Sequence, residues 1–178
     1  MTLYLENLDA ETRKWMLAEL DDDLAHNRLH ISPYLTGQGV HDYPNLLREA
    51  LEMGNDDTLA EALRAQRRIE RSATKRKPKG GYTIASVPAN AAQLLAESEF
   101  NRFYIRGVAR RAVEEGIPEV VVYRAKPVAE PRVESEALLE STIPPQVLLD
   151  DLRAHTSDKP VLGVPAGPGS GLSVRLPG

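Results

Sequence analysis

The chain of 178 residues contains no cysteine. This absence excludes disulfide bonds, metal sites with thiolate ligands and a cysteine nucleophile. Aromatic residues are also few, at 5% of the chain, whereas 42% of the residues are hydrophobic and 27% are charged. Such a composition is typical of a soluble globular protein, and the length suffices for one good core or two small ones.

Long hydrophobic runs are missing as well. No stretch approaches the roughly eighteen consecutive apolar residues that indicate a membrane-spanning helix. The N-terminal sequence MTLYLENLDAETRK has no basic stretch followed by an apolar core. We therefore expect neither a secretion signal nor a membrane as partner.

The common motifs of catalytic and ligand sites are absent too. The four histidines form no HExxH motif, and GPGSG at 167–171 lacks the Lys-Ser or Lys-Thr of a phosphate-binding loop. We find no GxSxG motif either. The sequence therefore predicts no catalytic, cofactor or metal residues, and an enzyme is not the favoured interpretation. A hydrolase or nuclease stays a third hypothesis, which rests only on scattered acidic residues: Glu130, Glu134, Glu136 and Glu140.

Charge is present in a strongly segmented pattern. Residues 1–65 hold 5 basic and 13 acidic groups, residues 66–111 hold 11 basic and 3 acidic groups, and residues 112–178 hold 6 basic and 10 acidic groups. Two interpretations fit this pattern. The segments attract each other within the fold or between copies, or the basic middle binds a polyanion.

Residues 1–65 have the periodicity of helices. Asp9 is a plausible N-cap for a helix over about 10–26. Asp42, with Pro44 in the first turn, is the expected start of a second helix that ends at Gly54. Asp56 or Asp57 is the expected cap of a third helix, and acidic groups at its N-terminus argue against a DNA-reading helix-turn-helix. The segment 66–81 is basic, poor in large apolar residues and rich in Pro and Gly near its end, which indicates an exposed linker or arm.

Residues 82–157 have an α/β pattern. GYTIASVP at 81–88 alternates like a strand, residues 90–115 form one long helix, and EVVVYRAKPV at 119–128 is a β-branched strand. Strand, helix and strand in this order predict a βαβ unit or a split variant. A short helix at about 145–155 precedes an extended Gly/Pro-rich tail, 158–178, that ends in the strand-like LSVRL. The predicted fold class is α+β: a helical N-terminal half, then a strand–long helix–strand unit with a small sheet and the extended tail.

EFNRFYIRG, residues 99–107, is the densest stretch of the chain. On a helical wheel its aromatic positions line the edge of an apolar face, and Gly107 indicates that another element crosses closely. The predicted packing residues are Phe100, Tyr104, Gly107 and Val108. The other flank carries a row of arginines, which is either a solvated face with helix ion pairs, such as Glu99 with the first arginine, or a contact row for phosphate or acidic groups. The candidate contact residues are this row and the basic residues of 66–81: Lys75, Arg76, Lys77, Lys79, Arg102, Arg106 and Arg110.

Three stretches together resemble a group of uncharacterised bacterial and prophage-encoded proteins: GGYTIASVPANAAQLLAESEFNRFYIRG, VVVYRAKPV and GPGSGLSVRLP. The resemblance covers nearly the whole chain. It implies a phage-related context and carries no activity or catalytic residue.

Two hypotheses on function follow. The first is a non-enzymatic structural or assembly protein, such as a minor component of a phage particle, that acts through protein–protein contacts as a homo-oligomer or with other subunits. In it, the C-terminal strand adds to a neighbour's sheet edge. The second is a nucleic-acid-associated protein that uses the 67–79 arm and the arginine row. Either hypothesis predicts a cytoplasmic or virion-associated location and no cofactor.

Overall fold

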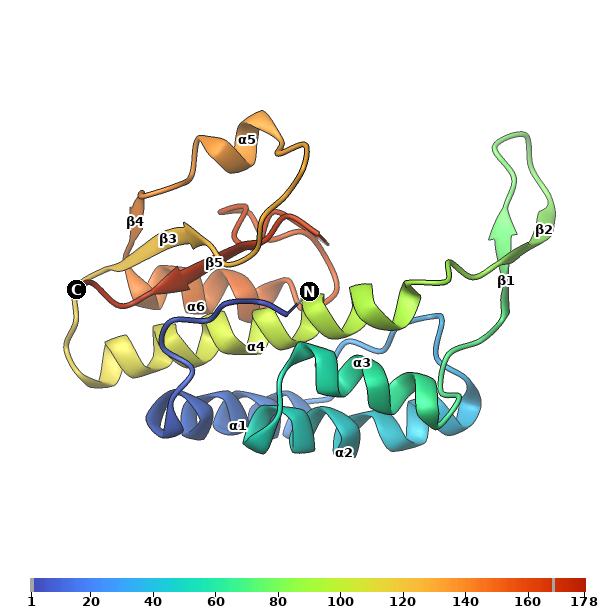
Figure 1. Ribbon diagram of the computed structural model, residues 1–178, viewed down its shortest axis with the longest axis horizontal. Helices are drawn as coiled ribbons and strands as arrows, with labels where there is room; N and C mark the ends of the chain where they lie inside the picture. The colour runs from blue at the N-terminus through green and yellow to red at the C-terminus, as the bar shows by residue number, and fades with distance from the viewer. Residues whose placement is uncertain (1, 168) are drawn as a thin grey trace.

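The computed structural model of the chain describes residues 2–167 and 169–178. Its fold is α+β with a helical N-terminal half, as the sequence predicts. Figure 1 shows the helices and two small antiparallel sheets. The helices are α1 (Ala10–Ala25), α2 (Gly37–Met53), α3 (Asp56–Ala65), α4 (Ala91–Glu114), α5 (Val133–Glu136) and α6 (Pro145–Ala154). The strands are β1 (Ser72–Arg76), β2 (Tyr82–Ser86), β3 (Val120–Arg124), β4 (Thr142–Ile143) and β5 (Leu172–Arg175).

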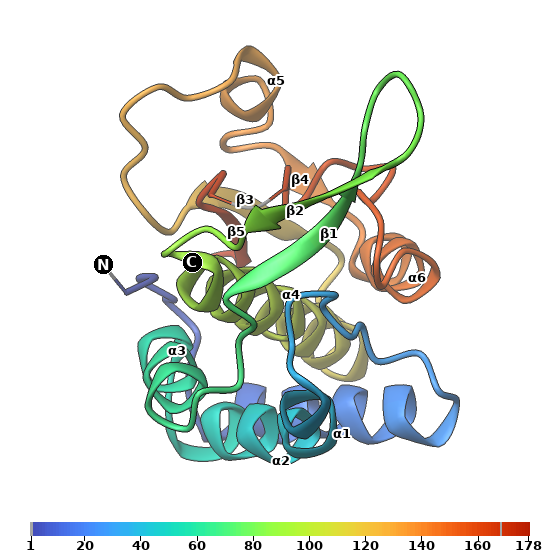
Figure 2. The same cartoon turned by 90° about the vertical axis from the view of Figure 1, so that its right-hand side faces the viewer.

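Helix α4 runs through the middle of the molecule. It packs against α1 and α3 on one side, and against α6, β3 and β5 on the other (Figures 1 and 2). Of its 24 residues, 17 are buried, so it is enclosed on most sides rather than lying on the surface with one apolar face. One hydrophobic cluster extends from Met16 to Val174, so residues of both halves of the chain share a core.

The start of each N-terminal helix is fixed by a side-chain cap. The Asp9 side chain accepts a hydrogen bond from the Thr12 N–H, as the sequence predicts for α1. The expected start of α2 at Asp42 is wrong, because Thr36 caps a helix that begins at Gly37 and contains Pro44 in its interior. At α3, Asn55 rather than an aspartate is the cap, and it forms a reciprocal capping box with Thr58. Helices α2 and α3 then pack against each other as a helical hairpin, with their apolar faces buried.

The C-terminal strand completes the chain's own sheet. Strand β3 lies between β4 and β5 and is antiparallel to both, with Val122 opposite Val174. Leu172, Ser173 and Val174 have no exposed surface. The buried Asn101 side chain of α4 donates to the Leu172 carbonyl, 2.7 Å away, and accepts from the Ser173 hydroxyl. The segment that we expected to reach a neighbouring sheet is therefore held by β3 and α4.

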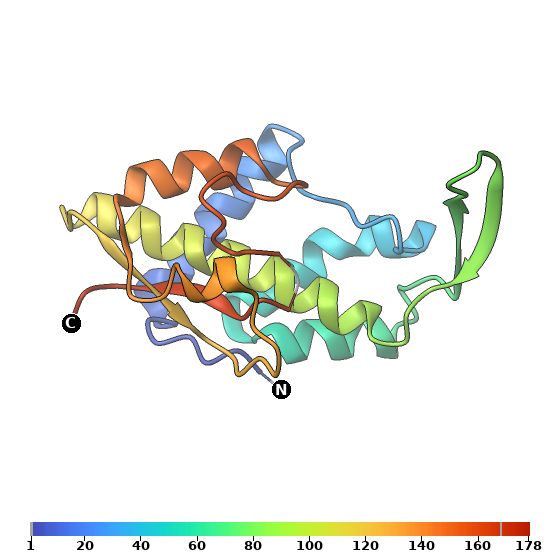
Figure 3. The ribbon, with the colours of Figure 1, turned by 90° about the horizontal axis from the view of Figure 1, so that it is seen from above.

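Strands β1 and β2 form a separate hairpin. They pair antiparallel from Ser72 opposite Ser86 to Arg76 opposite Tyr82, and the turn contains Gly80 and Gly81 with positive φ. The interpretation of β2, α4 and β3 as a βαβ unit is therefore wrong, because β2 and β3 belong to different sheets. Local alternation reveals a strand but not its partner. Figures 1 and 3 show the hairpin projecting from one end of the molecule, the end away from the C-terminus.

In the described part of the chain, no helix has the length and apolar composition that crossing a bilayer demands.

Candidate functional site

The hairpin carries its basic residues outside the folded body. We call residues 71–87 the arm. It contains five basic residues and no Asp or Glu: Arg71, Lys75, Arg76, Lys77 and Lys79. All five are exposed, and none takes part in an ion pair among the residues that the structure describes. Of the segment 66–81, which the sequence predicts to be a linker or arm, residues 71–81 are largely exposed and form a strand and a turn, whereas Arg68 and Ile69 contact the folded body.

One face of the arm combines apolar and basic side chains. In the antiparallel register Thr74 lies opposite Ile84, and Arg76 lies opposite Tyr82. Side chains of directly opposed residues share a face of the ribbon. Tyr82 is 73% exposed and Ile84 is 77% exposed. The segment 66–81 alone has no aromatic residue, so only the pairing of β1 with β2 places a tyrosine beside the basic positions.

The three arginines of the predicted row do not form a common surface. Arg106 has no exposed surface, and its guanidinium lies between two carboxylates of α1. It donates to Glu19 Oε2 at 2.8 Å and 3.0 Å, and to the two oxygens of Asp23 at 2.5 Å and 2.9 Å. Its hydrogen-bonding groups are therefore engaged inside the chain, where no partner molecule reaches them.

The two other arginines of the row also make contacts within the chain. Arg102 donates to the backbone carbonyls of His155 and Asp158 rather than pairing with Glu99. Arg110 forms ion pairs with Glu114, 3.1 Å away, and with Glu19, 3.4 Å away. Arg153 of α6 binds Glu19 as well, so one buried carboxylate joins α1, α4 and α6.

The charges of this cluster stabilise each other. Burial alone would raise the pKa of Glu19, but the hydrogen bond from Arg153 and the positive charge of Arg106 lower it below its ordinary value. Burial alone would lower the pKa of Arg106, whereas the hydrogen bond and charge of Asp23 raise it. This arrangement accounts for part of the segmented charge, because acidic residues of 1–65 neutralise arginines of 66–111 inside the fold.

The predicted packing residues of α4 are all enclosed. Phe100, Tyr104 and Val108 have no exposed surface. A Cβ built on Gly107 would lie 2.5 Å from Met16 Cγ and 3.0 Å from the Thr12 carbonyl oxygen, so α1 crosses α4 at this position.

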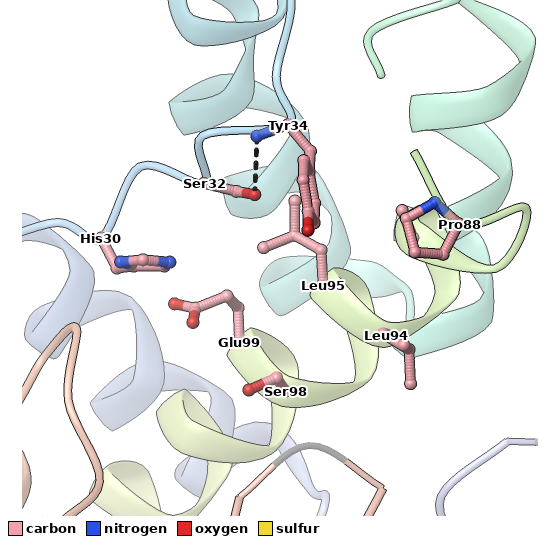
Figure 4. A pocket seen from close by; sticks show the side chains of 9 residues that line it. His30, Ser32, Tyr34, Pro88, Leu94, Leu95, Ser98 and Glu99 are labelled. Carbon is pink, nitrogen blue, oxygen red and sulfur yellow. Dashed lines mark hydrogen bonds between the residues drawn. The ribbon is translucent and has the colours of Figure 1, made fainter. Parts of the chain in front are cut away.

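A cleft lies between the first half of α4 and the segment that connects α1 to α2. It has two adjoining chambers, and both are lined by His30, Ser98 and Glu99. We call the chamber of about 220 Å³, beside Tyr34 and Pro88, the inner chamber, and the chamber of about 360 Å³, beside Arg102 and Arg132, the outer chamber, as names only. Figure 4 shows the side chains that line the inner chamber: the Glu99 carboxyl points toward the His30 ring, Tyr34 and Leu95 lie in the middle, and Pro88 and Leu94 lie on the far side from His30.

Glu99 is a buried carboxyl without a close partner. It is 4% exposed, and no hydrogen bond from the described residues offsets its burial. Burial raises the pKa of Glu99 to about 7, although the positive charges of Arg102 and Arg106 act in the opposite direction. Burial also lowers the pKa of His30, with a further contribution from the charge of Arg102.

Two further polar groups in this region lack partners. The Tyr43 hydroxyl is fully buried and has no hydrogen bond among the described atoms. Burial raises the pKa of Tyr43 well above its ordinary value, and the negative charge of Glu99 adds to the shift. Arg102 Nε is likewise buried and unpaired within the described chain. Unsatisfied buried groups cost stability, and of these two residues only Arg102 lines the cleft.

Sequence reasoning missed this cleft. It assigned Glu99 to a helix ion pair and His30 to no site, because neither residue belongs to a recognisable motif. The one available signal was the position of Glu99 between hydrophobic residues of α4, where a carboxylate is disfavoured. Across residues 2–167 and 169–178, no group of three or more His, Cys, Asp or Glu side chains could hold a metal ion.

The chain matches no family model, no curated protein and no solved structure. Its function has to be inferred from its own residues.

Proposed function

We propose that the protein binds nucleic acid through the arm. The observation that carries this proposal is the separation of five basic residues, without any acidic one, onto a projecting hairpin. Lysine and arginine side chains that neutralise phosphates release condensed counterions, which drives binding of any sequence. The arm offers its charges in a ribbon narrow enough to follow a groove or a single strand.

The mixed face of the arm supports contact with bases. Tyr82 is exposed and lies opposite Arg76, and an exposed aromatic ring can stack on any unpaired base. Arginine beside it can contact phosphate or stack on a base through its planar guanidinium. Single-stranded nucleic acid is therefore the preferred substrate class.

A salt-series titration tests this proposal. Fluorescence anisotropy of labelled single-stranded and double-stranded DNA and RNA is measured with the wild-type protein and with Lys75→Gln/Lys77→Gln. Each lost phosphate contact should lower the slope of log K against log salt by about 0.7 for single strands and about 0.9 for duplex DNA. Tyr82→Ala should weaken single-strand binding by about 1–3 kcal/mol and leave the slope unchanged.

The matched control is Lys14→Gln/Arg48→Gln, which removes the same charge from helices α1 and α2. It should bind like the wild-type protein, apart from a small uniform effect of net charge. Absence of binding at low salt, or equal losses in the two double variants, would contradict a site on the arm.

Structural assembly through protein–protein contacts is the second candidate function. The observation that favours it is the acidic exposed surface of α2 and α3, including Glu49, Glu52 and Glu61, which complements the basic arm. The arm of one copy would then bind the acidic helices of another, in a phage particle or a similar complex. Light scattering after size exclusion separates the two candidates, because assembly predicts an oligomer that the Lys75→Gln/Lys77→Gln variant dissociates.

A further inference from the structure

The cleft lies next to the base of the arm. Strand β2 ends at Ser86, and Pro88 lines the inner chamber only two residues later. The cleft and the arm share no basic residue, and the proposed function of the arm does not use Glu99, His30 or the cleft.

The inner chamber is suited to a flat ring with a polar edge. Its walls are mainly apolar and include the Tyr34 ring, Leu94 and Leu95 (Figure 4). Ser98 and Glu99 lie where this chamber meets the outer one. A hydroxyl and a carboxyl at one end of an apolar slot fit N–H and carbonyl groups on the edge of a heteroaromatic ring better than they fit a hydrocarbon chain.

The outer chamber is suited to an anion. Arg102, Arg132 and Lys159 line it, whereas Asp158 and the shared Glu99 are its acidic residues. Arg102 is 8% exposed and donates to the His155 and Asp158 carbonyls, so it adds positive charge to this chamber rather than a free donor. Arg132 is exposed, and its side-chain hydrogen bond within the described residues is a long one of 3.4 Å, to the Ala166 carbonyl. Guanidinium groups with free donors are the usual protein ligands of phosphate.

We propose that the cleft binds a nucleoside monophosphate, with the base in the inner chamber and the phosphate in the outer one. Ser98 and Glu99 contact the polar edge of the base, and Arg132 and Lys159 face the phosphate. The same chemistry is presented by a free nucleotide and by the terminal nucleotide of a strand that the arm holds. The cleft site does not depend on nucleic-acid binding by the arm.

The first experiment is isothermal titration of the full chain with the 5′-monophosphates of adenosine, guanosine, cytidine and uridine. At least one should bind, and its nucleoside and inorganic phosphate should each bind at least tenfold more weakly. Arg132→Gln should weaken the nucleotide at least fivefold, and Leu94→Trp, which fills the inner chamber from a half-exposed position, should abolish binding. Circular dichroism of each variant confirms that it is folded.

Two controls distinguish the cleft from other sites. Lys14→Gln/Arg48→Gln should leave nucleotide affinity unchanged, and so should the arm variant Lys75→Gln/Lys77→Gln. Loss of nucleotide binding in the arm variant would overturn the proposal, because the nucleotide would then bind to the arm. Absence of binding of all four nucleotides at millimolar concentration would overturn it as well, and neither result depends on whether the arm binds long strands.

A competition experiment identifies the source of the nucleotide. Oligonucleotides with and without a terminal phosphate are compared as competitors of the free nucleotide. Competition that requires the terminal phosphate and disappears in Arg132→Gln assigns the cleft to strand ends. Competition by free nucleotides alone assigns it to a free ligand.

Discussion

The arm and the cluster around Glu19 both use basic residues of the segment 66–111, and they use them in opposite ways. In the cluster, Arg106 and Arg110 bind carboxylates of α1 and α4 and are joined there by Arg153 of α6. In the arm, Lys75, Arg76 and their neighbours are exposed and have no ion pair within the described residues. The net charge of a segment therefore does not identify a binding surface. The informative quantity is the part of that charge that the fold leaves without a partner.

The largest expected effect comes from breaking the buried cluster. Arg106→Met removes the buried cation that binds both Glu19 and Asp23 and leaves Asp23 with only the longer Arg28 contact of 3.5 Å among the described residues, so the free energy of unfolding should fall by about 3–5 kcal/mol. Arg111→Met is the control, because Arg111 pairs at the surface with Asp9 and Glu115 and should cost less than about 1 kcal/mol. Urea denaturation measures the free energy of unfolding of both variants. Similar losses in Arg106→Met and Arg111→Met would show that burial of the Arg106 ion pairs does not determine their contribution to stability.

The second largest expected effect concerns Glu99, a buried carboxyl on the same helix that has no cation in direct contact among the described residues. Its pKa of about 7 in the folded protein lies above the ordinary value of 4.5, so the folded state binds this proton more tightly than the unfolded state. The resulting stabilisation is fully present below pH 4.5 and is lost as the pH rises to 7. We expect a loss of about 3 kcal/mol over this range.

The variant Glu99→Gln isolates this contribution, because the amide stays neutral at every pH. Carboxylates with lowered pKa values, such as Asp9 and Glu19, change stability in the opposite direction as the pH falls, and they are common to both proteins. The difference in unfolding free energy between wild type and variant should therefore change between pH 4.5 and 8. A difference that stays constant with pH would mean that Glu99 is ionised normally.

The variant Gly107→Ala, for which we expect a smaller effect, tests the close approach of α1 to α4. This approach brings Glu19 and Asp23 next to Arg106. Gly107→Ala places a Cβ against Met16 and the Thr12 carbonyl, and overpacking of this kind costs about 1–3 kcal/mol. The better helix propensity of alanine offsets roughly 1 kcal/mol, so we expect a net loss of about 1 kcal/mol. Gly37→Ala is the control, since a Cβ there meets no atom of the described residues within 4 Å. Differential scanning calorimetry should show a lower melting temperature for the first variant only.

Sequence periodicity was sufficient for some elements, and insufficient for the start of α2, for strand β1 and for the partners of the strands. Helix α4, strand β3 and the close contact at Gly107 were predicted, because each follows from a local pattern of apolar or small residues. The pairing of β2 with β1 and the return of β5 to β3 were missed, because alternation does not encode which strand lies beside which.

Charged residues were the least predictable part. Arg106 was assigned to an exposed row because arginine is rarely fully buried without a partner, and its partners lie more than eighty residues away on α1. Glu99 was assigned to a helix ion pair because its spacing from Arg102 permits one. The carbonyls of His155 and Asp158 compete for Arg102, and nothing in the local sequence reveals them.

The smallest expected effect on stability comes from substitutions in the arm, whose charges, unlike those of the Glu19 cluster, have no ion-pair partner within the described residues. Lys75→Gln/Lys77→Gln changes two exposed residues without ion-pair partners in the described chain, so the free energy of unfolding should stay within about 0.5 kcal/mol of wild type. Urea denaturation at two protein concentrations, tenfold apart, measures this. A clear destabilisation that appears only at the higher concentration would mean that the arm binds another copy of the chain, since oligomers gain stability by mass action. Unchanged stability at both concentrations, together with weaker nucleic-acid binding, would show that these two lysines bind an external polyanion. They would then contribute to binding by the protein without contributing to the stability of its fold.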